Sequence, residues 1–147
     1  MKALRSVRDD EILSSGLATV RTRFELEAPN RLTYAIAGGG RAIIIGSRRW
    51  DLTNGRWLAS PYQPLTVPSY IWQGAARARL LGRATLDGQS VRMLAAFRPD
   101  PEFPAWFLLY VTPDGRVLRA EMKAPAHFMV DRFSRFDRPL SIEPPSR

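Results

Sequence analysis

The 147-residue chain contains no cysteine and only one histidine, His127. Without cysteine it cannot form a disulfide bond, a thiolate nucleophile or a cysteine-rich zinc site. A Ser-His-Asp arrangement would depend entirely on His127, and no Gly-x-Ser-x-Gly elbow is present to supply the serine. We therefore predict that the chain has no catalytic residues, is not an enzyme and needs no cofactor.

Long apolar runs are also missing from the sequence. No run approaches the roughly 20 residues that cross a bilayer as a helix, and the first 16 residues hold no signal-like hydrophobic segment. We expect the chain as given to be soluble. Its start can equally be a boundary inside a longer protein with a targeting or membrane part.

Lysine is scarce as well, because every basic residue except Lys2 and Lys123 is an arginine. The formal net charge is +8, which favours anionic partners such as phospholipid head groups. The arginines are spread along the chain, however, a distribution also typical of solvated strand faces. Because no contiguous basic stripe or known module signature appears, we predict no nucleic-acid partner and keep an anionic membrane surface as a possible one.

Alternation of apolar and polar residues with period two dominates the rest of the sequence. The clearest hairpin is centred on Asp87-Gly88, a two-residue turn that pairs Leu86 with Gln89 and Ala84 with Val91. Gly38-Gly39-Gly40 and Asn54-Gly55 are interpreted as further hairpin turns, and Pro113-Asp114-Gly115 as the turn of a second strand pair. The alternation predicts strands over residues 17–28, 31–37, 42–45, 48–51, 56–57, 76–86, 89–98, 105–112, 117–122 and 127–136.

Three segments are not predicted as strands. Residues 2–13 place apolar side chains among charged ones in a pattern compatible with a short amphipathic helix, which Ser14-Ser15-Gly16 would end. Residues 60–68 contain three prolines and predict a loop or lid, and residues 139–145 predict a rigid, extended tail anchored by Ile142.

Together these elements predict a mainly β fold. We expect a single domain, 1–147, built from a curved antiparallel sheet that forms an unclosed half barrel, with the short N-terminal helix packed on it. Such a sheet has one apolar concave face, which either packs solid or leaves a pocket for a hydrophobic ligand. The pocket alternative predicts these ligand-binding residues: Phe24, Leu26, Leu32, Tyr34, Ile36, Trp50, Leu80, Met93, Phe107 and Leu109.

A second candidate site combines Met122, His127 and Met129. Thioether sulfur and imidazole suit copper(I), and residues 127 and 129 share one face of a strand. Methionines on a core strand also fill space in an ordinary way. The sequence leaves a copper site and simple packing open.

Several short motifs resemble those of a known group. Ala28-Pro29-Asn30-Arg31-Leu32, the two Asp-Gly hairpins and Phe133-Ser134-Arg135-Phe136 resemble the LolA/LppX superfamily of bacterial envelope lipoprotein and lipid carriers. That resemblance implies an unclosed β barrel with helices over its mouth, an extracytoplasmic location in the periplasm or cell envelope, and a lipid or lipoprotein acyl chain as ligand.

A narrower resemblance rests on Arg48-Arg49-Trp50, Pro104-Ala105-Trp106-Phe107 and Ala126-His127-Phe128-Met129. These motifs are similar to an extracytoplasmic domain of copper-resistance D (CopD)-like proteins. This resemblance implies fusion to, or association with, a membrane protein. It also implies an alternative function: an accessory or sensor domain of a bacterial copper-handling membrane protein, in place of a hydrophobic-ligand carrier.

Overall fold

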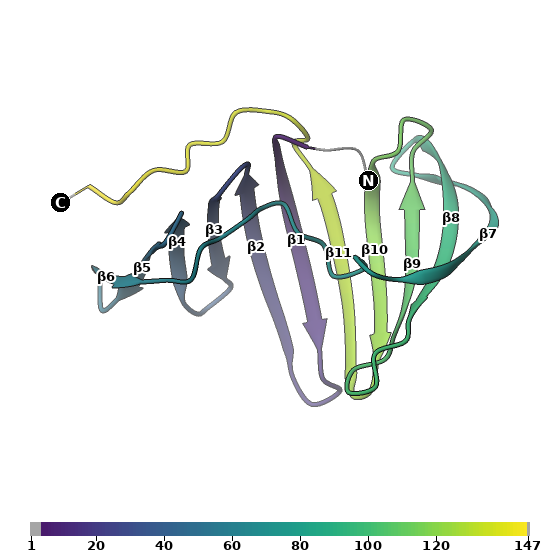
Figure 1. Cartoon of the computed structure of the whole chain (residues 1–147), viewed down its shortest axis with the longest axis horizontal. Helices are drawn as coiled ribbons and strands as arrows, with labels where there is room; N and C mark the ends of the chain where they lie inside the picture. Colours follow the sequence, from purple (N-terminus) through teal and green to yellow (C-terminus); the bar gives the residue numbers. More distant parts are fainter. Residues whose placement is uncertain (1–3, 147) are drawn as a thin grey trace. The chain divides into compact units, whose positions relative to one another are not determined.

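The computed structural model describes residues 4–146, which form eleven β-strands and no helix. The strands form one sheet in the order β6-β5-β4-β3-β2-β1-β11-β10-β9-β8-β7 (Figure 1). Their bounds are β1 Ser6–Ser14, β2 Thr19–Glu27, β3 Arg31–Ile36, β4 Arg41–Ile45, β5 Arg48–Thr53, β6 Arg56–Pro61, β7 Ala76–Leu86, β8 Gln89–Arg98, β9 Ala105–Val111, β10 Val117–Ala124 and β11 His127–Ser134.

The fold class predicted from the sequence is confirmed. The sheet is antiparallel, and it stays open because β6 and β7 lie at its two ends and do not pair with each other. Most neighbours in the sheet are also neighbours in the chain, as expected from hairpin spacing. The architecture is therefore the mainly β, unclosed half barrel that the alternation indicated.

The N-terminal helix is the part of the fold prediction that is wrong. Residues 2 and 3 lie outside the described residues, and β1 occupies most of the segment expected to be helical. The charged side chains of β1 make cross-strand ion pairs with β2: Arg8 contacts Glu25 at 2.5 Å, and Arg23 contacts Asp10 at 2.6 Å. Pairing between strands thus outweighs the weak helical pattern of this short segment.

The tight turns are where the sequence predicted them. Asn54 and Gly55 have φ of 51° and 76°, and Asp87 and Gly88 have φ of 48° and 76°. Positive φ at both central residues is what a two-residue hairpin turn of this type requires. As predicted, Leu86 is opposite Gln89 and Ala84 is opposite Val91.

The chain divides into two compact units. Of the described residues, unit 1 comprises 11–19 and 70–133, and unit 2 comprises 4–10, 20–69 and 134–146. In unit 2 the extended C-terminal tail buries Leu140 and Ile142, and Arg31 donates a hydrogen bond of 2.8 Å to the carbonyl oxygen of Ile142. The tail anchor predicted at Ile142 is thus confirmed, and Leu140 adds a second one.

Candidate ligand-binding face

Unit 1 has one apolar face formed by four neighbouring strands. The register sets Ala96, Phe107, Met122 and Met129 in one row across β8, β9, β10 and β11. The adjacent row consists of Leu94, Leu109, Ala120 and Asp131. We call these eight residues and Phe133, which continues the alternation of β11, the Phe107 face. All of them except Leu94 are buried.

The opposite face of the same strands is open to solvent. Trp106 and Phe128, each one residue away from a member of the Phe107 face, are 60% and 52% exposed. Side chains of successive strand residues point to opposite faces, so this contrast follows directly from the register. The Phe107 face is therefore the one that is covered.

An aromatic segment between β6 and β7 contacts the Phe107 face. Tyr70 and Trp72 stack with ring centroids 4.9 Å apart, and both meet the ring of Phe133 edge-on, at 6.1 Å and 5.5 Å. We call residues 70–75 the strap; they belong to the teal segment that leads into β7 in Figure 1. The strap is irregular, and its internal backbone hydrogen bonds are Gln73 N–H to Tyr70 O and Ala75 N–H to Trp72 O.

Arg98 ties the strap to the face. Its guanidinium donates hydrogen bonds to the carbonyl oxygens of Ile71 (3.1 Å) and Phe103 (3.3 Å). The same group lies over the rings of Phe103 and Phe107, at 5.8 Å and 5.9 Å from their centroids. A charged hydrogen bond and cation–π contacts are individually modest in strength, so the strap is held by a few side-chain contacts.

Asp131 is an acid within this apolar face. It is 2% exposed, and its Oδ1 atom has no hydrogen-bond partner among the described residues. Burial, together with the negative charge of Glu11, raises the pKa of Asp131 to about 7. Burial also raises the pKa of Glu11. The face thus contains a carboxyl group that changes charge near neutral pH.

In unit 2 the structure brings together five of the predicted ligand-binding residues. Phe24 is opposite Tyr34, with ring centroids 5.9 Å apart, and Leu26 is opposite Leu32. Ile36 continues the same face of β3. These residues form an apolar face of unit 2.

Tyr34 also takes part in a polar cluster. Arg49 binds both carboxylate oxygens of Asp51, and its Nη2 donates a 2.8 Å hydrogen bond to the hydroxyl oxygen of Tyr34. The hydrogen bonds from Arg49 lower the pKa of Asp51. The guanidinium further lies over the rings of Tyr34 and Tyr62. These contacts make Tyr34 a structural residue on its face.

The predicted common face is wrong for two of the ten residues. Tyr34 is opposite Ala42, so Ala42 and Ile44 share the face of Tyr34. Trp50 is opposite Ile43, the residue between them, and therefore points to the other face. Met93 is opposite Tyr110, one residue out of step with Phe107 and Leu109.

Leu80 is on the side of the Phe107 face, since it is opposite Leu94, but it is 62% exposed at the end of the sheet. Phe107 and Leu109 are the predicted ligand-binding residues that lie within the Phe107 face itself.

The register also places the three candidate copper ligands. Met122 is directly opposite Met129, both are buried, and His127 shares their face by alternation. The Nδ1 atom of His127 lies 3.1 Å from the carbonyl oxygen of Pro125, and its ring is 5.8 Å from that of Phe103. Among residues 4–146 there is no grouping of three or more His, Cys, Asp or Glu side chains suited to a metal ion. Methionine is not one of these ligand types, so a copper site formed by Met122, His127 and Met129 stays a prediction.

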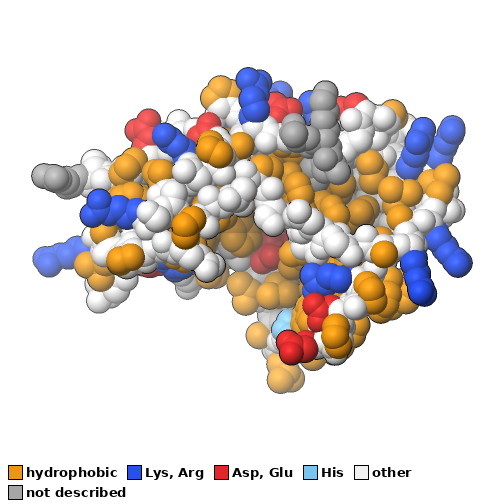
Figure 2. All heavy atoms as spheres, viewed as in Figure 1, with side chains coloured by type: hydrophobic (Ala, Val, Ile, Leu, Met, Phe, Trp, Pro, Cys, Tyr) orange, Lys and Arg blue, Asp and Glu red, His pale blue; other side chains and the backbone are white. Residues whose placement is uncertain are grey.

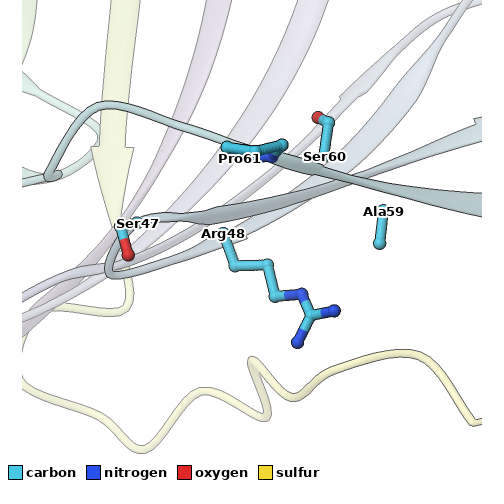
Figure 3. A pocket seen from close by; sticks show the side chains of 5 residues that line it. All are labelled: Ser47, Arg48, Ala59, Ser60 and Pro61. Atoms are coloured by element: carbon cyan, nitrogen blue, oxygen red, sulfur yellow. The ribbon is translucent and has the colours of Figure 1, made fainter.

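A surface hollow of about 330 Å³ lies elsewhere, on the β5–β6 hairpin (Figure 3). Its lining residues are Ser47, Arg48, Ala59, Ser60 and Pro61. The guanidinium of Arg48 lies over the ring of Trp50 at 5.6 Å from its centroid. Small, partly polar walls of this kind do not match an acyl chain, which needs apolar lining.

Sequence reasoning missed Asp131 and the strap contacts. Asp131 could have been found, because it occupies an apolar position in the alternation of Met129 and Phe133. The partner of Tyr70 and Trp72, by contrast, is more than 60 residues away in the chain, and no local pattern indicates it.

Among the described residues, no helix is long and apolar enough to span a membrane. No protein-family model matches the chain, and no curated protein is significantly similar to it in sequence. Solved structures do match. The lipoprotein LppX from Mycobacterium tuberculosis superposes with a TM-score of 0.68 at 14% identity, covering 97% of this chain and 91% of LppX.

LprF from Mycobacterium bovis gives a TM-score of 0.66 at 10% identity, over 99% of this chain and 91% of LprF. An uncharacterized conserved protein from Thermus thermophilus gives 0.51 at 15% identity, over 90% of this chain and 80% of that protein. The chain therefore shares the open-sheet fold of LppX and LprF over nearly its whole length.

Proposed function

We propose that this chain is a non-enzymatic binding or carrier domain for a hydrophobic ligand, a lipid or a lipoprotein acyl chain, which it holds on the Phe107 face beneath the strap. The observation that carries the proposal is the cover of this face. An irregular aromatic segment, tied by Arg98, lies where a packed domain would place a helix or a second sheet. A cover of this kind can move aside at low cost.

The strap and an acyl chain offer the face the same kind of contact. Tyr70 and Trp72 supply apolar ring surface to Phe133, and a ligand that displaces them replaces this surface with methylene groups. Each buried methylene contributes about 0.8 kcal/mol, so about eight of them contribute about 6 kcal/mol, from which the lost ring contacts and the cost of association are subtracted. The binding that results is weak and reversible, as a carrier requires.

We further infer that the chain belongs to the LolA/LppX-like superfamily, that residues 1–147 act as one domain and that it works in the cell envelope. The sequence motifs and the shared fold of the lipoprotein LppX support this inference. The net charge of +8 supports an anionic membrane as the surface that the domain meets. A carrier of acyl chains must exchange its ligand with such a surface.

Two tryptophans of the chain provide a matched test of the proposed site. Trp72 lies in the strap against Phe133, whereas Trp106 is exposed on the opposite face of the sheet. Single-tryptophan variants that retain one or the other, with phenylalanine at the remaining positions, are titrated with a brominated fatty acid. Bromine quenches tryptophan fluorescence only at short range.

We expect saturable quenching of Trp72 at micromolar ligand and little quenching of Trp106. Equal quenching of both residues would indicate nonspecific adsorption and would overturn the proposed site. The absence of quenching at Trp72, with retained fold by circular dichroism, would overturn the carrier function.

A further inference from the structure

The β7–β8 hairpin concentrates positive charge at one end of the sheet. Residues 76–98 contain five arginines and one acidic residue, Asp87. Arg77, Arg79, Arg83 and Arg92 are exposed, and none of the four has an ion-pair partner among the described residues. Basic side chains project at the right-hand side of Figure 2, where Figure 1 places β7 and β8. The hairpin is thus an uncompensated cationic surface.

Two of these arginines face each other directly. Arg83 is opposite Arg92 in the register of β7 and β8. Like charges at directly opposed positions of an antiparallel pair destabilise the pair, and no carboxylate of the described residues relieves the repulsion by an ion pair. An external anion held between the two guanidinium groups would remove this cost.

Apolar side chains lie between the arginines. Leu80 and Leu81 are 62% and 58% exposed, although they are consecutive residues of a strand. The register shifts between Leu80 and Gly82, which makes Leu81 an extra residue in β7. Such a bulge changes the direction of side chains and bends the strand. The result is an exposed pair of leucines flanked by Arg79 and Arg83.

The irregular backbone of β7 argues against a partner strand at this edge. A second register shift lies between Ala76 and Arg79, and Arg77 has a positive φ of 53°. Bulges and exposed charges are the features that discourage edge-to-edge pairing of sheets. A nucleic acid would use the arginines but would leave the leucines exposed to water. An anionic bilayer accommodates both, because head groups meet the guanidinium groups and the leucines enter the interface.

We propose that the β7–β8 hairpin is the surface with which this domain docks on anionic lipid bilayers, through Leu80, Leu81 and the four exposed arginines. This inference rests on the proposed carrier function, because it names the surface of the domain that would lie on the membrane while ligand is exchanged. Its physical basis is separate, since the eight residues and Phe133 that define the Phe107 face, and the strap, include none of these residues; Leu80 lies on the same side of the sheet as that face but is exposed at the end of the sheet.

The test is co-sedimentation of the full chain with phosphatidylglycerol-containing vesicles and with pure phosphatidylcholine vesicles. Each arginine near an anionic surface strengthens binding about fivefold at low salt. Arg83→Gln/Arg92→Gln should therefore weaken binding to the anionic vesicles about twenty-five-fold. Leu80→Gln/Leu81→Gln should weaken it as well. The matched control, Arg41→Gln/Arg56→Gln, removes the same charge from exposed positions in unit 2 and should change binding much less.

Equal losses in the two arginine double variants would overturn the proposal, because net charge alone would then explain the attraction. Equal binding of the wild type to both kinds of vesicle would also overturn it. So would a result in which single-stranded DNA abolishes vesicle binding and the leucine variant binds vesicles as well as the wild type does.

Fatty-acid binding in solution, measured on the same variants, keeps the two proposals distinct. It should be unchanged in Arg83→Gln/Arg92→Gln. A wild-type chain that docks through the hairpin but binds no fatty acid would refute the carrier function and leave the docking surface standing.

Discussion

Replacing Asp131 with asparagine should change the pH dependence of stability in a characteristic way. In the folded chain the pKa of Asp131 is raised from the ordinary 3.8 to about 7, mainly by burial. Below both values the carboxyl is neutral in the folded and unfolded states, and no ionisation cost arises. Between them the folded state binds more protons, so the contribution of Asp131 to stability falls as pH rises.

The size of this effect follows from the shift. About three pKa units at about 1.4 kcal/mol each give a cost on the order of 4 kcal/mol, which is complete above about pH 7. An asparagine at this position cannot ionise, but its buried amide groups cost about 1–3 kcal/mol at every pH. Asp131→Asn should therefore be destabilising near pH 4 and should gain on the order of 4 kcal/mol relative to the wild type by pH 8.

Urea unfolding, followed by tryptophan fluorescence between pH 4 and pH 8, measures this difference. Groups with lowered pKa, such as Asp51, make the wild type gain stability as pH rises, but their contribution cancels between the two chains. Glu11→Gln is the control: the pKa of Asp131 should fall yet stay above its ordinary value, because burial is the larger cause. A difference between Asp131→Asn and wild type that is independent of pH would refute the reasoning.

Three further predictions concern the framework around the site. Gly88→Ala should destabilise by about 1 kcal/mol because Gly88 has φ of 76°, whereas Gly40→Ala, with open space and no positive φ, should be nearly neutral in the same urea assay. Ile142→Ala should cost about 2–5 kcal/mol, because the side chain is fully buried; a loss below about 1 kcal/mol would show that the tail does not anchor unit 2. Arg98→Met should loosen the strap and speed hydrogen exchange of the Gln73 amide at least about tenfold, and unchanged exchange would show that Arg98 does not hold it.

The parts of the fold that the sequence predicted well are those decided locally. Asp87-Gly88 and Asn54-Gly55 determine a turn type by their tolerance of positive φ, and the turn determines the register of the strands on either side. The N-terminal strand was not predicted, because its mixture of apolar and charged residues fits a helix as well as a strand. Only its pairing with β2, a non-local event, decides between them.

The candidate site was predicted less completely, for two physical reasons. A bulge between Leu80 and Gly82 puts Leu80 and Ala84 on opposite sides of the sheet, which simple alternation along β7 cannot reveal. The pairing of β8 with β9, which no local pattern gives, points Met93 away from the side of Phe107. The strap reaches Phe133 across a long stretch of chain, so its contact depends on the finished sheet. Both features depend on contacts between segments that are distant in the sequence, so the sequence pattern alone does not reveal them.

The most direct test of the central claim is native mass spectrometry of the protein purified from its host, with organic extraction of any bound molecule. We predict a one-to-one complex with an acyl-chain molecule, which is either already present after purification or formed on incubation with fatty acids or phospholipids. Protein that stays free of ligand under both conditions, while retaining its β-rich circular dichroism, would contradict the hydrophobic-carrier account.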